Sequence, residues 1–322
     1  MIVSMKPPYE ITPKILKLIT SISEQIGAVN ANLLDKPSPQ LRKQNKIKTI
    51  HSSLSIEGNT LSEEQITALI ENKRIIGPKR DVLEVLNAIK VYDRLSSFDP
   101  FSEKSFLKAH CLLMDGLVDN AGKFRTQDVG ILQGAKIAHI APPATNVPSL
   151  MSDLFQYLKN KDELTLIKSC VFHYEVEFIH PFIDGNARMG RLWQTLILMK
   201  EYSVFEYLSF ETLISRSQKK YYEVLAKCDQ AGNSTLFIEF MLDVINKSLS
   251  ELLNFSQRIL NDTDRLEYFC SLGKKEFTRK DYMNVFKDIS MATASRDLKK
   301  GVEMKLFEKT GNKNLTVYKL LK

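Results

Sequence analysis

Apolar side chains recur along most of the chain at spacings of three and four residues, which is the period of a helix with one buried face. The first stripe of this kind comprises Ile15, Leu18, Ile19, Ile22 and Ile26. The same pattern predicts further helices over residues 41–57, 81–95, 102–114, 150–158, 164–179, 188–200 and 217–260. The sequence therefore predicts a mainly α protein.

Glycine and proline interrupt this pattern. Residues 31–41 contain two prolines and are predicted to form a loop. Gly58 and Asn59 are a stop signal after the second helix, so Glu57 is expected at a helix end; Thr60 with Glu63, or Ser62 with Gln65, would cap the next helix. Several glycines and prolines between residues 116 and 148 predict a flap, with a short hairpin over about residues 129–140.

The chain turns polar over residues 261–264, which indicates a domain boundary. Beyond it, two short helices and a third, which Ser290 would cap, precede two extended segments over 305–310 and 314–320. Helices followed by such a hairpin resemble a winged helix. We therefore expect three regions: an N-terminal helical region over 1–95, a central core over 96–260 and a winged-helix domain over 264–322.

The composition is that of an ordinary globular protein, with 43% hydrophobic and 26% charged residues. No apolar run is long enough to span a bilayer, and Lys6, Pro7, Pro8 and Glu10 break the stretch that a signal peptide would need. These features predict a cytoplasmic protein without a membrane partner. The cysteines have no metal-ligand spacing and are expected to be small buried side chains rather than disulfide or zinc ligands; they are Cys111, Cys170, Cys228 and Cys270.

The net charge of +7 is concentrated at the C-terminal end. Residues 265–322 contain 14 Lys/Arg and 7 Asp/Glu, and the charges of the rest of the chain cancel. Arg296, Lys299 and Lys300 would line the exposed face of the last helix, where a major-groove reader carries its basic side chains. DNA is one partner that fits this module; a docking or dimerisation role is the alternative.

The segment HPFIDGNARMGR, residues 180–191, concentrates chemistry between two core helices. The helix before it is apolar on most of its circumference and is expected to be buried. His180 precedes a proline, which disfavours helical backbone and should present the histidine at the helix end. The next helix begins directly afterwards, so its unpaired N–H groups face the same short loop.

A helix start of this composition is suited to phosphate. Gly185 permits close approach, Asn186 can donate from its amide, and Arg188 and Arg191, three residues apart, can clamp one polyphosphate. Asp184 would repel that polyphosphate unless a cation lay between them, which predicts Mg²⁺. His180 could then take a proton from an attacking hydroxyl. Alternatively, Asp184, Gly185 and Asn186 form an ordinary turn, Asp184 caps a helix, and the two arginines face water.

This segment resembles the motif of the Fic family, HxFx(D/E)GNxRxxR, and the similarity extends in organisation over about residues 45–240. The resemblance implies a Fic helical core and AMP transfer from ATP to a Tyr, Thr or Ser hydroxyl of a target protein. His180 would be the general base and Asp184 the Mg²⁺ ligand. The ATP phosphates would lie on Gly185, Asn186, Ala187, Arg188, Met189, Gly190 and Arg191. Within that set, Asn186 and the loop amides would bind the α-phosphate, Arg188 the β-phosphate and Arg191 the γ-phosphate, and Ala187 stands where relatives usually have glycine.

Residues 53–58, SLSIEG, resemble the family's inhibitory motif (S/T)xxxE(G/N). The resemblance implies that Ser53 and Glu57 form an inhibitory element in which Glu57 pairs with Arg191 and displaces the γ-phosphate. A carboxylate on a phosphate-binding arginine competes for the same bidentate geometry. The alternative is a surface helix end.

Two weaker similarities concern the target and the adenine. Strand addition to the flap, at Ile137, Ala138, His139 and Ile140, would align the target backbone. Tyr221, Tyr222 and Asp229 resemble the adenine side of the family's site, although the tyrosines could equally be core residues. His173 is interpreted as a core histidine, and His51 is given no role.

The sequence thus predicts an autoinhibited protein adenylyltransferase that uses ATP and Mg²⁺. Other transfers on the same loop stay open: removal of AMP, or transfer of another nucleotide, a phosphoryl group or phosphocholine. A DNA-binding regulator that only senses nucleotide is the remaining alternative, but such a protein would need neither the base His180 nor the metal ligand Asp184. The target is unidentified and could be the protein itself, and a homodimer is compatible with the sequence.

Overall fold

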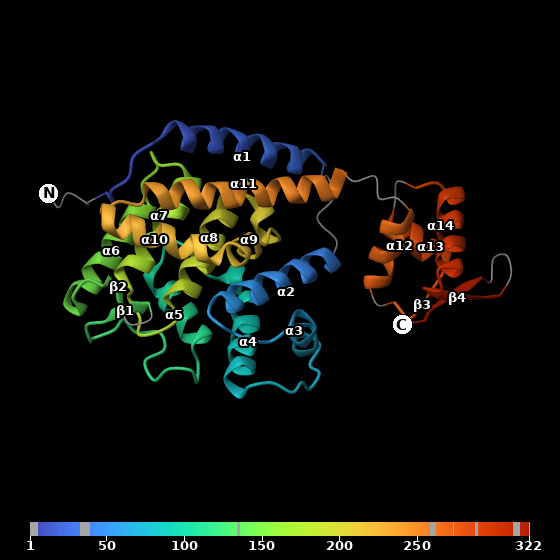
Figure 1. Cartoon of the computed structure of the whole chain (residues 1–322), viewed down its shortest axis with the longest axis horizontal. Helices are drawn as coiled ribbons and strands as arrows, with labels where there is room; N and C mark the ends of the chain where they lie inside the picture. The colour runs from blue at the N-terminus through green and yellow to red at the C-terminus, as the bar shows by residue number, and fades with distance from the viewer. Residues whose placement is uncertain are drawn as a thin grey trace. The chain divides into compact units, whose positions relative to one another are not determined.

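The computed structural model describes residues 6–32, 39–133, 136–257, 262–272, 274–286, 289–311 and 316–321 (Figure 1). The chain divides into two compact units, residues 1–253 and 254–322. The regions predicted over 1–95 and 96–260 share the first unit up to residue 253. The described residues are mostly helical, so the predicted mainly α class is confirmed.

The first unit consists of helices and one small hairpin. Its α-helices are α1 (Pro13–Asn32), α2 (Pro39–Ile56), α3 (Glu63–Ile70), α4 (Lys79–Tyr92), α5 (Glu103–Leu113), α6 (Val147–Leu158), α7 (Thr165–Ile179), α8 (Asn186–Glu201), α9 (Glu211–Arg216), α10 (Gln218–Ala231) and α11 (Thr235–Gln257). Short 3₁₀ turns are η1 (Leu95–Ser97), η2 (Ala144–Asn146) and η3 (Ser203–Glu206), and the hairpin strands are β1 (Gly130–Gln133) and β2 (Lys136–Ile140).

Helices α7 and α8 form the centre of the first unit (Figure 1). α7 is buried around most of its circumference, as its sequence predicted. In α8, Trp193 packs edge-on against Phe106 of α5, with ring centroids 5.0 Å apart, and its Nε1 donates to the carbonyl of Pro100 at 3.0 Å. Because both helices are fixed in the core, the loop between them is held at both ends.

Helix α1 lies along α11 (Figure 1) and is joined to it by polar contacts. Thr12 donates to Glu239 at 2.7 Å, and the Gln25 amide donates to Asn246 at 2.6 Å. The long helix α11 therefore ties the N-terminal helix to the end of the first unit.

The structure corrects two of the predicted helix boundaries and selects one of the two predicted caps of α3. α2 starts at Pro39, inside the predicted loop 31–41, because proline is tolerated in the first turn of a helix. The stretch predicted as helical over 217–260 is two helices, since Gly232 ends α10 in the left-handed conformation, with φ 64°. Ser62 and Gln65, not Thr60 and Glu63, form the capping box of α3.

Beyond α11, the described residues of the second unit form three helices and a three-stranded antiparallel sheet. They are α12 (Asp262–Ser271), β3 (Glu276–Phe277), α13 (Arg279–Val285), α14 (Met291–Glu303), β4 (Phe307–Thr310) and β5 (Val317–Leu320), with strand order β3-β5-β4. Ser290 caps α14 as predicted, and the elements follow the order expected of a winged helix, which stays a prediction.

A buried ion pair holds the core of the second unit. Arg265 donates to both carboxylate oxygens of Asp297, at 2.6 and 2.8 Å, and Tyr282 donates to Asp297 at 3.1 Å. On α14, Arg296 and Lys299 are exposed as expected. Lys300 is not fully exposed: it binds Asp262 at 2.7 Å, so it is partly committed within the unit.

The structure shows how far the four cysteines are buried and whether any helix could span a membrane. Cys170 and Cys228 are buried, but Cys111 is exposed and Cys270 half-buried, so the expectation of four buried thiols was wrong for these two. Among the described residues, no helix has both the length and the apolar character required to cross a bilayer.

Candidate active site

The loop of residues 180–191 is shaped by its own polar groups. His180 ends α7 with φ 50° and ψ 59°, a left-handed conformation that is uncommon for a residue other than glycine. Asn186 reaches back across the turn: its Nδ2 donates to the carbonyl of Phe182 at 2.9 Å, and its Oδ1 accepts from the amide of Phe182 at 2.8 Å. The Asn186 side chain, which the sequence suggested for phosphate, therefore uses its oxygen and one of its two amide N–H groups to brace the loop.

Gly185 occupies a position that strongly disfavours any residue with a side chain. Its φ is 89°, and an added Cβ would lie 2.8 Å from the sulfur of Met114. His110 lies beside it, stacked on Phe182 with ring centroids 3.5 Å apart. Because His110 Nδ1 accepts from the amide of Gly122, its Nε2 donates to the carbonyl of Asp184 at 3.0 Å. Burial lowers the pKa of His110 to about 4, so this ring is a neutral brace.

Arg125 connects the loop of residues 180–191 to the base of the flap. Its Nε donates to the carbonyl of His180 at 2.7 Å, and Nη2 donates to Ile179 at 3.2 Å and Pro142 at 2.5 Å. Nη1 donates to Gln127 at 2.8 Å. The backbone positions before and after the hairpin are thus fixed by the same guanidinium that holds the carbonyl of His180.

Arg191 is fully buried and is bound by the end of α2. Its Nη2 donates to Glu57 Oε1 at 2.9 Å and to the carbonyl of Ser53 at 2.8 Å, and its Nε donates to Ser53 Oγ at 3.1 Å. Glu57 keeps 26% of its side chain exposed and is followed by Gly58, with φ 90°. Burial opposes the charge of Arg191, but Glu57 attracts it, and the pKa of Arg191 is raised overall.

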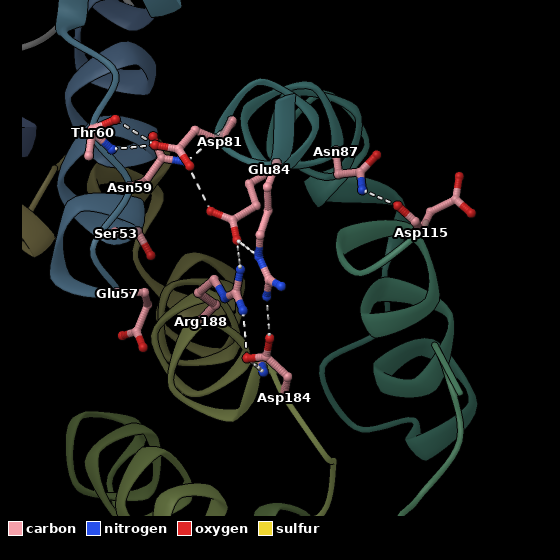
Figure 2. Close-up of polar contacts among 12 residues, drawn as sticks. Ser53, Glu57, Asn59, Thr60, Asp81, Glu84, Asn87, Asp115, Asp184 and Arg188 are labelled. Atoms are coloured by element: carbon pink, nitrogen blue, oxygen red, sulfur yellow. Dashed lines mark hydrogen bonds and ion pairs between the residues drawn. The ribbon is translucent and has the colours of Figure 1, made fainter. Parts of the chain in front are cut away.

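Arg188 is enclosed by two carboxylates. Figure 2 shows its guanidinium between Asp184 and Glu84. Nη2 donates to Asp184 Oδ1 at 2.8 Å, and Nη1 lies 3.4 Å from Glu84 Oε1. Arg80, which is largely exposed, donates to Asp184 Oδ2 at 3.1 Å and to Glu84 at 3.5 Å. Two arginines and two carboxylates therefore alternate in one network at the start of α8.

Buried polar side chains of α7, α8 and α10 form a hydrogen-bonded cluster in the core. Tyr221 donates to Glu177 at 2.8 Å and contacts His173 Nε2 at 3.0 Å, while His173 Nδ1 contacts Gln194 at 2.7 Å. Burial, and then the charge of Glu57, raise the pKa of Glu177 to about 7. Burial lowers the pKa of His173 to about 3, which agrees with its interpretation as a core histidine.

The flap is a hairpin with an irregular register. Gly130 pairs with Ile140, Ile131 with His139 and Leu132 with Ile137, and a bulge lies between residues 131 and 132. Within the described residues β1 is the only strand paired with β2. The side chains of residues 137–140 lie outside what the structure describes, so their contact with a target stays a prediction.

On the adenine side, Tyr221 is fully buried, which favours the core interpretation of this residue. Tyr222 is half-buried, and Asp229 accepts a hydrogen bond from Tyr174 at 3.0 Å. The adenine role of Tyr222 and Asp229 stays a prediction.

Asp184 suits a cation that takes few protein ligands. In the described part of the chain no three His, Cys, Asp or Glu side chains gather around a metal position. Asp184 is 37% exposed, and both its oxygens now face arginines. A single exposed carboxylate beside a phosphate cradle fits Mg²⁺, which keeps several waters and takes phosphate oxygens.

Comparison with known proteins agrees with this geometry. The Fic/DOC family model matches residues 100–198. The solved structure of a Fic family protein from Desulfovibrio desulfuricans G20 is 41% identical, with a TM-score of 0.75, and the match covers 98% of both chains. The chain belongs to the Fic family. Fic-1 from C. elegans, at 22% identity and a TM-score of 0.63, shares the fold over 74% of this chain.

The Fic chain also resembles curated relatives named protein adenylyltransferase Fic. The one from Nematostella vectensis is 24% identical over 263 residues, 75% of this chain and 58% of the relative. The one from Culex quinquefasciatus is 27% identical over 241 residues, or 45% of its own length. The chain thus spans about half the length of these relatives.

The structure brings most of the predicted residues into one site: His180, the loop to Arg191, Asp184, and Ser53 with Glu57. It does not bring Tyr221 to the surface of that site. The sequence reasoning missed His110, Arg125 and Glu84. Each of these braces the loop from a distant helix or connection, and a lone polar residue in a helical stripe or a turn carries no spacing signal that would reveal it.

Proposed function

We propose that this Fic protein transfers AMP from ATP to the hydroxyl of a Tyr, Thr or Ser in a target protein, and that Glu57 restrains the reaction. The contact of Glu57 with Arg191 supports this proposal best, because a carboxylate on the second loop arginine takes the position of a phosphate group. A buried guanidinium needs such a counter-charge when nucleotide is absent.

In the proposed reaction the ATP phosphates lie at the start of α8. His180 Nδ1 faces the carbonyl of Glu177 at 3.4 Å and must donate to it, so Nε2 carries the lone pair in the neutral ring. Nε2 takes the proton of the target hydroxyl, and the oxygen attacks the α-phosphorus. The bond from the α-phosphorus to the bridging oxygen of the β-phosphate breaks, and pyrophosphate leaves. Arg188 would hold the β-phosphate and Arg191 the γ-phosphate.

Asp184 would hold Mg²⁺ together with phosphate oxygens, and the ion would neutralise phosphate charge when bound. In the arrangement described above, Arg80 and Arg188 occupy both carboxylate oxygens. Binding of the cation therefore requires at least one of these arginines to turn toward phosphate.

The experiment that tests the chemistry compares ATP labelled at the α-phosphate with ATP labelled at the γ-phosphate. Glu57→Gly protein is incubated with each in the presence of Mg²⁺ and a lysate. Protein-bound label from the α position alone supports AMP transfer, whereas label from the γ position would show phosphoryl transfer instead. Loss of label from a pre-modified target would indicate removal of AMP, the alternative reaction of the same loop.

The exposed Arg296 and Lys299 support DNA as a partner of the second unit. The full chain should shift a DNA duplex, and the double change Arg296→Ala and Lys299→Ala should weaken that shift. Equal binding by both proteins would assign the module to protein docking or dimerisation.

The target could also be the protein itself. In the lysate experiment with labelled ATP, such self-modification would appear as label on the protein's own band.

A further inference from the structure

We infer that Glu84 is a positioning residue that holds Arg188 for the β-phosphate, and that Asn59 joins it to the inhibitory segment. This inference rests on the proposed function of the site, in which Arg188 meets the β-phosphate. Glu84 belongs to α4, 104 residues away from Arg188, and its 8% exposure places its carboxylate inside the protein. Figure 2 shows Glu84 and Asp184 on opposite sides of the guanidinium.

Both oxygens of Glu84 have partners. Oε1 is shared by Arg188 and Arg80, and Oε2 accepts from the Asn59 amide at 2.9 Å. The same Asn59 amide donates to the carbonyl of Asp81 at 3.1 Å. A carboxylate with these partners, at an interior position of a helix, is held in place by several elements at once. We therefore expect it to stay beside Arg188 and to restrain the guanidinium through Nη1 when nucleotide enters.

Glu84 and Glu57 differ in this respect. Glu57 directly follows α2, is partly exposed and precedes a glycine in the left-handed conformation, so a local change of backbone is enough to remove it from Arg191. Asn59, two residues further on, is anchored to α4, and Thr60 donates twice to Asp81, at 2.6 and 2.8 Å. Release of Glu57 can thus occur while Asn59 and Glu84 keep their places. Glu57 is therefore a carboxylate that can leave Arg191, whereas Glu84 is one that stays beside Arg188.

The test uses a pair of nucleotides that differ only in the β-phosphate. Affinities for Mg-ADP and for AMP are measured by calorimetry in the full chain carrying Glu57→Gly, with and without Glu84→Gln. Removing the fixed charge beside Arg188 should weaken ADP binding by about tenfold, the factor equivalent to about 1.4 kcal/mol, and leave AMP binding unchanged. Asn59→Ala should act in the same direction with a smaller effect.

Asp81→Asn is the matched control, because Asp81 is one turn earlier on α4 and its carboxylate accepts hydrogen bonds from Thr60. Its contact with Asn59 is made by the backbone carbonyl, which the substitution keeps. The Asp81→Asn variant should have an unchanged ratio of ADP to AMP affinity, even if the midpoint of its thermal unfolding falls. A merely structural role of Glu84 would lower the thermal midpoint and weaken both nucleotides equally, and that result would overturn the inference. Tighter ADP binding in Glu84→Gln would also overturn it, because Glu84 would then be a competitor.

The same data separate the inference from the proposed function. If the Glu57→Gly chain binds neither nucleotide, or if Arg188→Ala leaves the ADP to AMP ratio unchanged, the phosphate site itself is wrongly assigned. If Arg188→Ala removes the preference for ADP and Glu84→Gln does not, only the role of Glu84 is wrong.

Discussion

Glu57, at the end of α2, accepts a hydrogen bond of 2.9 Å from Arg191, whose guanidinium is completely buried in α8. Ser53, one helical turn earlier, binds the same guanidinium through its hydroxyl and its carbonyl. The end of one helix therefore supplies three acceptors to a single arginine of the phosphate loop. A phosphate group that binds Nη2 of Arg191 has to compete with Glu57.

Glu57→Gly should strengthen ATP binding by roughly ten- to a hundredfold, since a hydrogen bond to a charged group contributes about 1.5–3 kcal/mol. ADP lacks the γ-phosphate that Arg191 would bind, so its affinity should change little. Calorimetric titration with both nucleotides measures the difference. Glu24→Gly, at an exposed position of α1, is the control for the introduction of a glycine and should alter neither affinity. An equal gain for ATP and ADP would argue against a γ-phosphate role of Arg191.

Exchange of glycine and alanine should impair the protein at position 185 but have little effect at position 187. Gly185→Ala places a methyl group against Met114 at a positive φ, which should destabilise the protein by about 1–3 kcal/mol and reduce AMP transfer at least about tenfold. Ala187 lies in the first turn of α8 and does not have positive φ, so the glycine that relatives usually have here is not required. Ala187→Gly should keep its activity and cost at most about 1 kcal/mol. Thermal unfolding and a transfer assay on both variants would show whether the two positions differ as expected.

Arg125→Ala should impair both stability and catalysis. The change leaves four backbone carbonyls, including that of His180, without their donor, which should cost about 2–4 kcal/mol. Chemical denaturation measures the loss, and kcat should fall because the backbone of His180 and the flap are released together. The exposed Arg74→Ala is the control and should stay within about 0.5 kcal/mol of wild type. If Arg125→Ala retained full kcat at a temperature where it is folded, the connection between flap and histidine would have no catalytic role.

Features encoded in a contiguous motif could be predicted from the sequence, whereas contacts between distant parts of the chain that no motif encodes could not. The helix end at His180, the turn at Gly185 and the pairing of Glu57 with Arg191 are encoded in contiguous motifs, and these residues meet in the structure. The break at Gly232 was missed because apolar periodicity continues on both sides of it. Glu84 and Arg125 depend on contacts between elements far apart in the chain, and no periodicity reports such contacts.

Stability should fall as the pH rises through the range in which Glu211 loses its proton. Burial raises the pKa of this carboxyl from 4.5 to about 7, against the opposing attraction of Arg191; Thr195 binds Oε1, and Oε2 is a buried atom without a partner. Between these values the folded state binds a proton that the unfolded state has released, so the free energy of unfolding decreases with rising pH.

Glu211→Gln carries no ionisable proton and should flatten this dependence, with a gain at pH 8 of roughly 1–3 kcal/mol over wild type and little gain at pH 5. A slope should persist in the variant, because burial also raises the pKa values of Glu175 and Glu177 to about 7. Urea denaturation from pH 5 to pH 8 provides the comparison, and exposed Glu206→Gln is the control. An unchanged slope in Glu211→Gln would mean that this carboxyl is charged in the folded protein.

In the proposed function, His180 catalyses AMP transfer and Glu57 restrains it through Arg191. The most direct measurement is the incorporation of α-labelled ATP into protein by wild type, Glu57→Gly, and Glu57→Gly combined with His180→Ala, with Mg²⁺ and the same lysate. We expect little label with wild type, strong label with Glu57→Gly and none with the double variant. Equal label with wild type and Glu57→Gly would contradict the restraint, and label that persists in the double variant would contradict the role of His180.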